Sequence, residues 1–198
     1  MNRWRLSAFG LILALIAVLG MTDVAFTHED LTFRWDIVSV DITTKPPTVR
    51  PGGKASARAQ DGSKITLTGK GTFKPEEPER VTGGGKWATF ASDGKRTAHG
   101  TYEVTRLVHW KQAPGTAPEM KDKIGRRKDA RAGLAVLQIE FSNGESGTLV
   151  VSCHLVGTPD SVFEGITASM GFVDYWQREA PSDDPFVDAN RTLFHLQR

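Results

Sequence analysis

Glycines placed inside an alternating apolar pattern constrain this chain more than any other feature. Ile65, Leu67 and Phe73 share one face of a segment whose other face is polar. Such alternation predicts a half-buried β-strand. Gly69 and Gly71 take the inward positions between Leu67 and Phe73, so they remove side chains from the core side of the sheet. Either an aromatic ring from a neighbouring strand or a bound ligand is expected to fill that space.

The remainder of the chain repeats this organisation. Its 20 glycines and 10 prolines separate short runs of Thr, Val, Ile, Phe and Trp, which favours an all-β fold. Asp93-Gly94 and Asn143-Gly144 are typical of tight hairpin turns. No segment after residue 30 has a helical period with caps. We therefore expect one all-β domain over residues 31–198, a single antiparallel barrel or sandwich of about eight strands. A barrel of that size can hold one small ligand.

The first expected strand, residues 33–42, is apolar on both faces. One face is formed by Phe33, Trp35 and Ile37, and the other by the alternate residues from Val38 to Ile42. The apolar phase therefore changes midway. This pattern predicts either a bulge or a strand that is covered on both sides.

Residues 1–25 have the layout of an export signal. A basic start, Asn2 to Arg5, precedes an apolar run from Leu6 to Met21. We expect a signal peptide or, if the segment is not cleaved, an N-terminal membrane anchor. Either outcome makes the domain extracytoplasmic, secreted or periplasmic. The single cysteine, Cys153, cannot form an intrachain disulfide, which fits a bacterial rather than an animal secreted domain.

Charge excludes one class of partner. The chain has 25 basic and 23 acidic residues, whereas a nucleic-acid-binding protein needs a one-sided basic surface. The long connection 111–132 nevertheless carries a local basic cluster. That cluster, in the stretch 121–131, is a candidate site for an acidic envelope partner, and its alternative is an ordinary solvated loop. Its members are Lys121, Lys123, Arg126, Arg127, Lys128 and Arg131.

Arg106 is the first candidate for a ligand-binding residue. Counting by twos places it on the same face as Tyr102, Val104, Val108 and Trp110. A guanidinium on an apolar face needs a partner, because it stays charged. It could clamp an anion inside a cavity, form a structural ion pair, or turn outward at a bulge or strand end.

Two carboxylates are candidates for the same pocket. Glu164 and Asp174 lie in phase with the apolar face of residues 162–176. Along one straight strand they would be about 33 Å apart, so only a bend near Gly165 or Gly171 could make them a catalytic pair. The alternative is that both stand in water at strand ends. The predicted ligand-binding set is Tyr102, Arg106, Trp110, Glu164 and Asp174, with Trp87 and Trp35 as further candidates.

Other reactive side chains give weaker signals. Cys153 and His154 are adjacent on a strand, so they point to opposite faces and cannot form a nucleophile–base pair. Cys153 is expected to be a buried apolar residue. A surface metal site made of His99, His109 and His154 is an alternative, but no ligand spacing typical of metal sites is present, and we expect no metal or cofactor.

The stretch from Val151 to Trp176 resembles one found in exported bacterial proteins, and the resemblance extends from about Phe33 to the C-terminus. No activity is attached to those proteins, so the resemblance implies no functional residue. The glycine and aromatic rhythm of Gly69 to Phe73 and of Gly83 to Trp87 is similar to that of allene oxide cyclase and dirigent barrels. This likeness implies a barrel and no particular activity.

Three functions remain open from sequence. The first is a β-barrel that binds a small amphiphile or anion in its interior. The second is a structural or interaction module of the cell envelope, and the third is a cyclase-type or hydrolase-type enzyme that uses the carboxylates. A cavity inside the barrel would favour the first function, and a packed interior would favour the second.

Overall fold

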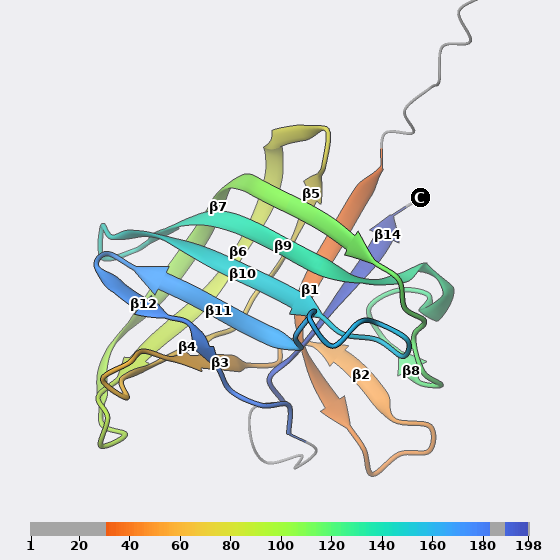
Figure 1. Ribbon diagram of the computed structural model, residues 1–198, viewed down its shortest axis with the longest axis horizontal. Coiled ribbons are helices and arrows are strands. Elements are labelled where there is room, and N and C mark those ends of the chain that lie inside the picture. The colour runs from red at the N-terminus through yellow and green to blue at the C-terminus, as the bar shows by residue number, and fades with distance from the viewer. Residues whose placement is uncertain (1–30, 183–188, 198) are drawn as a thin grey trace, which may run out of the picture.

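The computed structural model describes residues 31–182 and 189–197 of the chain (Figure 1). The predicted export segment, residues 1–25, lies outside this part. Within the described residues, no helix is long and apolar enough to cross a membrane. The elements are β1 (Thr32–Asp41), β2 (Thr48–Pro51), β3 (Ala55–Arg58), β4 (Lys64–Leu67), β5 (Lys70–Lys74), β6 (Glu77–Phe90), β7 (Arg96–Ala113), β8 (Lys121–Asp122), the 3-10 helix η1 (Arg127–Asp129), β9 (Ala130–Phe141), β10 (Ser146–Cys153), β11 (Gly165–Met170), β12 (Val173–Tyr175), β13 (Gln177–Arg178) and β14 (Arg191–Gln197).

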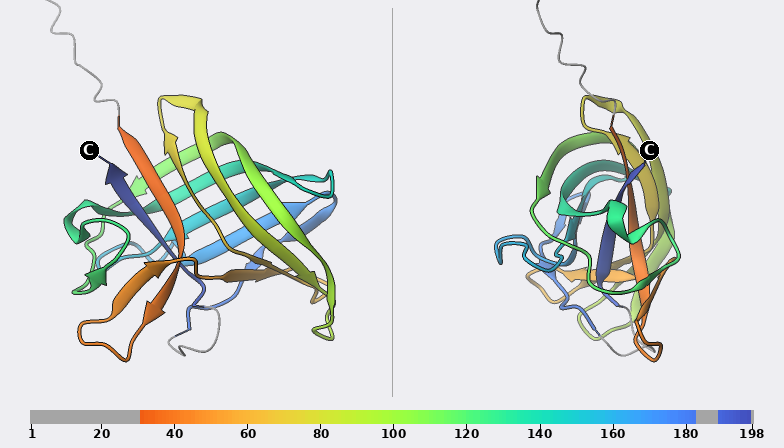
Figure 2. Two further views of the ribbon diagram at one scale, coloured as in Figure 1. Left: turned by 180° about the vertical axis from the view of Figure 1, so that it is seen from behind. Right: turned by 90° about the vertical axis from the view of Figure 1, so that its right-hand side faces the viewer.

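The all-β prediction is confirmed, and six strands form a closed antiparallel barrel. Each strand of the ring β9–β14–β1–β5–β6–β7 pairs with the next, and β7 returns to β9 (Figure 2). The predicted number of about eight strands is too small for the whole sheet and too large for the closed ring. Long strands explain the difference, because β6 and β9 run beyond the ring and pair there with β4 and β10.

Two extensions continue the sheet outside the barrel. One is β10–β11–β12, which begins on β9, and the other is β4–β3–β13, which begins on β6. The two extensions curve toward each other, and β3 lies against β11 (Figure 1). A separate hairpin folds β2 back on β1, and β8 adds to β2 in parallel.

The turn predictions are confirmed. Asp93-Gly94 lies between β6 and β7, and Asn143-Gly144 lies between β9 and β10; both glycines have positive φ. The expected connection 111–132 is shorter than predicted, because β7 continues to Ala113 and β9 begins at Ala130. What remains between them contains β8 and η1.

Aromatic rings fill the interior of the barrel. A Cβ added to Gly71 would lie 2.7 Å from Nε1 of Trp35, and one added to Gly69 would meet Trp35 and the hydroxyl of Tyr102. The space above the two glycines is therefore filled by aromatics from neighbouring strands and not by a cavity. Beside Trp35, a second aromatic group packs with ring centroids 4.7–6.2 Å apart. Its members are Phe33, Phe73, Trp110 and Phe194.

Candidate functional site

The structure contradicts the predicted inward position of Arg106. On β7, Val104 and Arg106 face consecutive residues of β9, and so do Leu107 and His109, so β7 has an extra residue at two places. Each extra residue is a β-bulge that reverses the alternation. After the first bulge, Leu107 enters the core and Arg106 turns out, with its side chain 53% exposed and its Nε 3.3 Å from Oε1 of Glu79.

The second bulge restores the original phase, so Trp110 points inward as predicted. Tyr102 is buried and donates a hydrogen bond of 2.9 Å to the carbonyl oxygen of Thr68. Trp87 is also buried, and its Nε1 donates to the carbonyl oxygen of Thr101 at 3.0 Å. These rings, together with Trp35, pack in the core, and none of them lines the cavities described below.

The two predicted carboxylates are not brought together. The chain does bend at Gly171, but Asp174 then pairs with Ser169 on β11. Ser169 lies five residues from Glu164, or roughly 16 Å along extended backbone. The turn also reverses the phase, so Asp174 is exposed on the outer face of β12 while Tyr175 points into the core. The arrangement does not support a carboxylate-pair enzyme.

A cavity of about 490 Å³ lies outside the barrel, beside the end of β1; we call it the apolar cleft. Its volume is within the range typical of small-molecule sites. The β1–β2 hairpin forms one wall, and the segments 118–120 and 154–157 form the others. The lining residues are Val38, Val40, Ile42, Pro47, Val49, Pro118, Glu119, Met120, His154, Leu155, Val156, Gly157, Glu164, Arg191, Thr192 and Leu193.

The second apolar face of β1 explains why the cleft exists. Phe33, Trp35 and Ile37 point into the barrel, so Val38 and Val40 point outward from the same strand. Of the two alternatives predicted for this strand, a bulge or cover on both sides, the structure shows the second, because the register of β1 with its neighbours has no shift. The cover over its outer face is incomplete, and Ile42 and Val156 remain exposed at the cleft.

Glu164 forms the polar end of the cleft. Its carboxylate oxygens accept hydrogen bonds of 2.6 Å from the backbone N–H groups of His154 and Thr192, so it joins the end of β10 to the start of β14. Burial raises the pKa of Glu164 to about 7, although these two backbone donors and the charge of Arg191 favour the ionised form. The side chain can therefore change protonation state near neutral pH.

His154 is held beside this carboxylate. Its ring Nδ1 lies 2.7 Å from the carbonyl oxygen of Val162, which makes Nδ1 the donor in the neutral tautomer. The ring is partly buried and belongs to the lining of the cleft. An apolar volume that ends on Glu164, His154 and Arg191 can hold an apolar molecule and orient its polar group.

Cys153 is buried, as predicted, and burial raises the pKa of its thiol well above the ordinary value. A raised pKa leaves the thiol protonated and unreactive. The alternative histidine metal site is not formed: within residues 31–182 and 189–197, no three His, Cys, Asp or Glu side chains are placed to share a metal ion.

A second polar cluster lies on the outer face of β1 and β14. Nε2 of His195 is 2.7 Å from Oδ2 of Asp122, and Asp122 also accepts hydrogen bonds from the backbone N–H groups of Ile124 and Gly125. Burial alone would raise the pKa of Asp122, but these three hydrogen bonds outweigh burial and hold it at about 2. This pair fixes the loop that carries the basic cluster of residues 121–131 to the barrel.

Of the predicted ligand-binding residues, only Glu164 lines the cleft. Sequence reasoning did not identify the segments 118–120 and 154–157, which have no periodic pattern and meet only in the tertiary structure. The signal that was present is the second apolar face from Val38 to Ile42, because a strand in the wall of a filled barrel is expected to be polar on its outer face unless another part of the chain or a ligand covers it.

Comparison of the chain with protein-family models, with curated protein sequences and with solved structures finds no match. The resemblances drawn from the sequence therefore assign no role to any residue, and the functional interpretation depends on the geometry of this chain alone.

Proposed function

We propose that this protein binds a small amphiphile in the apolar cleft. The observation that supports this most directly is an apolar volume of about 490 Å³ that ends on the partly buried carboxylate of Glu164, whose pKa is raised to about 7. Small-molecule sites combine largely apolar walls with a few polar groups that orient the ligand. The packed barrel interior excludes the enclosed position expected from sequence, so the proposed site lies outside the ring.

The polar end defines the chemistry of the ligand head group. Both oxygens of Glu164 already accept one backbone hydrogen bond each, and a carboxylate oxygen can accept a second. Arg191 and His154 lie at the same end and favour a head group that also accepts hydrogen bonds. A hydroxyl or carboxyl group meets both requirements, and the apolar body would lie along Val38, Val40 and Leu155.

Displacement of a fluorescent apolar probe tests this proposal. N-phenyl-1-naphthylamine would be bound to the full chain and displaced by octanol and octanoate. Val156→Asp is the informative variant, because Val156 is 66% exposed at the cleft and its replacement leaves the core unchanged. We expect it to weaken probe binding about tenfold or more.

The matched control is Val108→Asp, because Val108 is a similarly exposed valine on β7, outside the cleft. It should leave probe affinity unchanged. Saturable probe binding that Val156→Asp does not weaken would contradict the proposal, and so would the absence of saturable binding to the unmodified protein.

The packed interior also supports a second candidate function, an envelope interaction module. The basic residues from Lys121 to Lys128 are exposed, while Asp122 pins their loop to the barrel. Replacing Lys121, Lys123 and Lys128 by Ser should then abolish co-sedimentation with phosphatidylglycerol vesicles without changing the melting temperature. Unchanged co-sedimentation would contradict this role. We also propose that the domain lies outside the cytoplasm, as the export-signal layout of residues 1–25 predicts. Cell fractionation and N-terminal sequencing of the mature chain would test this location.

A further inference from the structure

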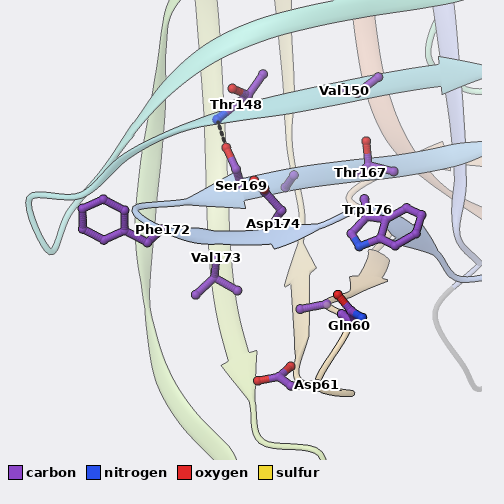
Figure 3. A pocket seen from close by; sticks show the side chains of 12 residues that line it. Gln60, Asp61, Thr148, Val150, Thr167, Ser169, Phe172, Val173, Asp174 and Trp176 are labelled. Carbon is purple, nitrogen blue, oxygen red and sulfur yellow. Dashed lines mark hydrogen bonds between the residues drawn. The ribbon is translucent and has the colours of Figure 1, made fainter.

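A larger and more open cavity, of about 760 Å³, lies on the β10–β11–β12 extension of the sheet (Figure 3). We call it the aromatic groove. It runs over the outer face of β10, β11 and β12 and is bounded by the turn between β3 and β4. Its lining residues are Ala59, Gln60, Asp61, Thr148, Val150, Thr167, Ala168, Ser169, Phe172, Val173, Asp174 and Trp176. None of these residues lines the apolar cleft.

Strand register explains why this face is both polar and aromatic. Leu149 pairs with Ala168, and Ala168 pairs with Tyr175; all three point into the core. The residues that alternate with them must therefore face outward. That outward set places hydroxyl groups on β10 and β11 and Asp174 on β12, with Phe172 just before β12 and Trp176 just after it. Figure 3 shows Phe172 at one end of the groove and Trp176 at the other, with Asp174 between them.

The two aromatic rings are unusually accessible. Phe172 is fully exposed, and Trp176 is 61% exposed. They lie four residues apart, or about 13 Å along an extended strand, which leaves room for more than one sugar ring between them. Exposed apolar groups clustered on one surface typically mark a binding site, and a large aromatic ring gains the most from being covered.

The polar groups of the groove select against an anionic occupant. Among the described residues that line it, two are carboxylates, Asp61 and Asp174, and none is Lys, Arg or His. Asp61 accepts hydrogen bonds from the backbone N–H of Ser63, at 2.9 Å, and from its hydroxyl, at 2.6 Å, which fix the position of the carboxylate. Gln60 and Thr167 add donors and acceptors on either side.

We propose that the aromatic groove binds an uncharged oligosaccharide. A sugar ring has an apolar C–H face, which stacks on an aromatic ring, and a rim of hydroxyl groups, which donate to carboxylates and accept from amides and hydroxyls. Phe172 and Trp176 supply two stacking surfaces, and Asp61, Asp174 and Gln60 supply the partners for the rim. This site is separate from the apolar cleft and does not depend on the function proposed for it.

Isothermal titration of the full chain with cellohexaose, maltohexaose and chitohexaose tests the proposal. We expect at least one of them to bind at millimolar concentration or below. Trp176→Ala should weaken that binding about tenfold or more, because tryptophan is enriched among the few residues that contribute most of the binding energy at an interface. Phe172→Ala and Asp174→Asn should weaken it to a smaller extent.

Two controls keep the outcome decisive. Val108→Ala, at an exposed apolar position outside the groove, and Val156→Asp, in the apolar cleft, should leave saccharide binding unchanged. All the substituted side chains are exposed, so the variants should keep the melting temperature of the unmodified protein. The proposal is overturned if no saccharide binds, if Trp176→Ala binds as tightly as the unmodified protein, or if spermidine or tetramethylammonium binds in place of the saccharides.

Discussion

The interior of the barrel and the apolar cleft lie on opposite faces of the same strand, β1, and are filled in opposite ways. On the inner face, Trp35 packs against glycines of β5 and β6 so closely that no atom could be added. On the outer face, Val38 and Val40 are covered only by a hairpin and two loops, and a cavity remains.

The difference follows from how each face is covered. Closure of the six-stranded ring fixes the distance between opposite walls, so side-chain volumes must match and rings pair with glycines. Loops and hairpins have no such regular spacing, so their cover over the outer face of β1 leaves space. In this protein, binding sites are therefore expected where the sheet is covered by loops and not inside the ring. Four variants can break or sharpen this comparison.

Gly71→Ala should have the largest effect. Its Cβ would meet the backbone carbonyl oxygen of Thr82 and lie 2.7 Å from both Cα of Gly83 and Nε1 of Trp35. We expect the free energy of unfolding, measured with urea, to fall by about 4 kcal/mol. The control is Gly144→Ala, which has positive φ but open space around it and should cost about 1 kcal/mol. Equal costs for the two variants would mean that the barrel wall can move.

Glu164→Gln should remove a pH dependence of protein stability that is caused by the carboxyl group at the polar end of the cleft. Because the pKa of Glu164 is raised to about 7 in the folded protein, the folded state holds its proton at a pH where the unfolded chain has released it. Stability should therefore fall as pH rises from about 4.5 to 7, by about 3 kcal/mol for this group.

Urea unfolding at a series of pH values would measure this slope. The Gln variant should lack it, whereas Glu76→Gln, at an exposed turn, should keep it. An unchanged slope in Glu164→Gln would show that the end of the cleft is as well solvated as the surface.

Asp122→Asn should change the pH dependence of stability in the direction opposite to that of Glu164→Gln. The pKa of Asp122 is lowered to about 2 in the folded protein, so its contribution is present above the unfolded value and is lost as pH falls from about 4 to 2. We expect the variant to be about 2 kcal/mol less stable at neutral pH and to lose less stability in acid. Thermal unfolding at pH 3 and pH 7 would measure both effects, and an acid sensitivity equal to that of the unmodified protein would contradict the assignment.

Arg106→Ala should have the smallest effect. The ion pair with Glu79 is exposed on both sides, and such pairs contribute about 0–1 kcal/mol. The variant should also bind N-phenyl-1-naphthylamine as the unmodified protein does. A loss of either stability or probe binding would contradict the outward position of Arg106 and would favour the inward position that the alternation pattern predicted.

The sequence predicted the regular parts of the sheet well and failed where a bulge or a turn interrupts the alternation. Strands and hairpins with regular alternation were predicted well, as was the buried Cys153. The space above Gly69 and Gly71 was left open between an aromatic ring and a ligand, and the structure fills it with Trp35 and Tyr102. Arg106 was misplaced because a bulge adds one residue to β7 and leaves no mark in the pattern of apolar residues. Asp174 was misplaced because the turn at Gly171 reverses the phase of the residues that follow it.

Local alternation, glycine placement and turn residues were sufficient to determine that this chain is all-β, where its hairpins turn and that aromatic side chains such as Tyr102 and Trp110 point inward, because these features depend on neighbours a few residues apart. Only the tertiary structure decided which strands close the ring, that its interior is filled, and that Glu164 meets residues from the segments around 118 and 192. Those contacts depend on strand register and loop placement, which change when a single bulged residue is added and therefore cannot be read from periodicity.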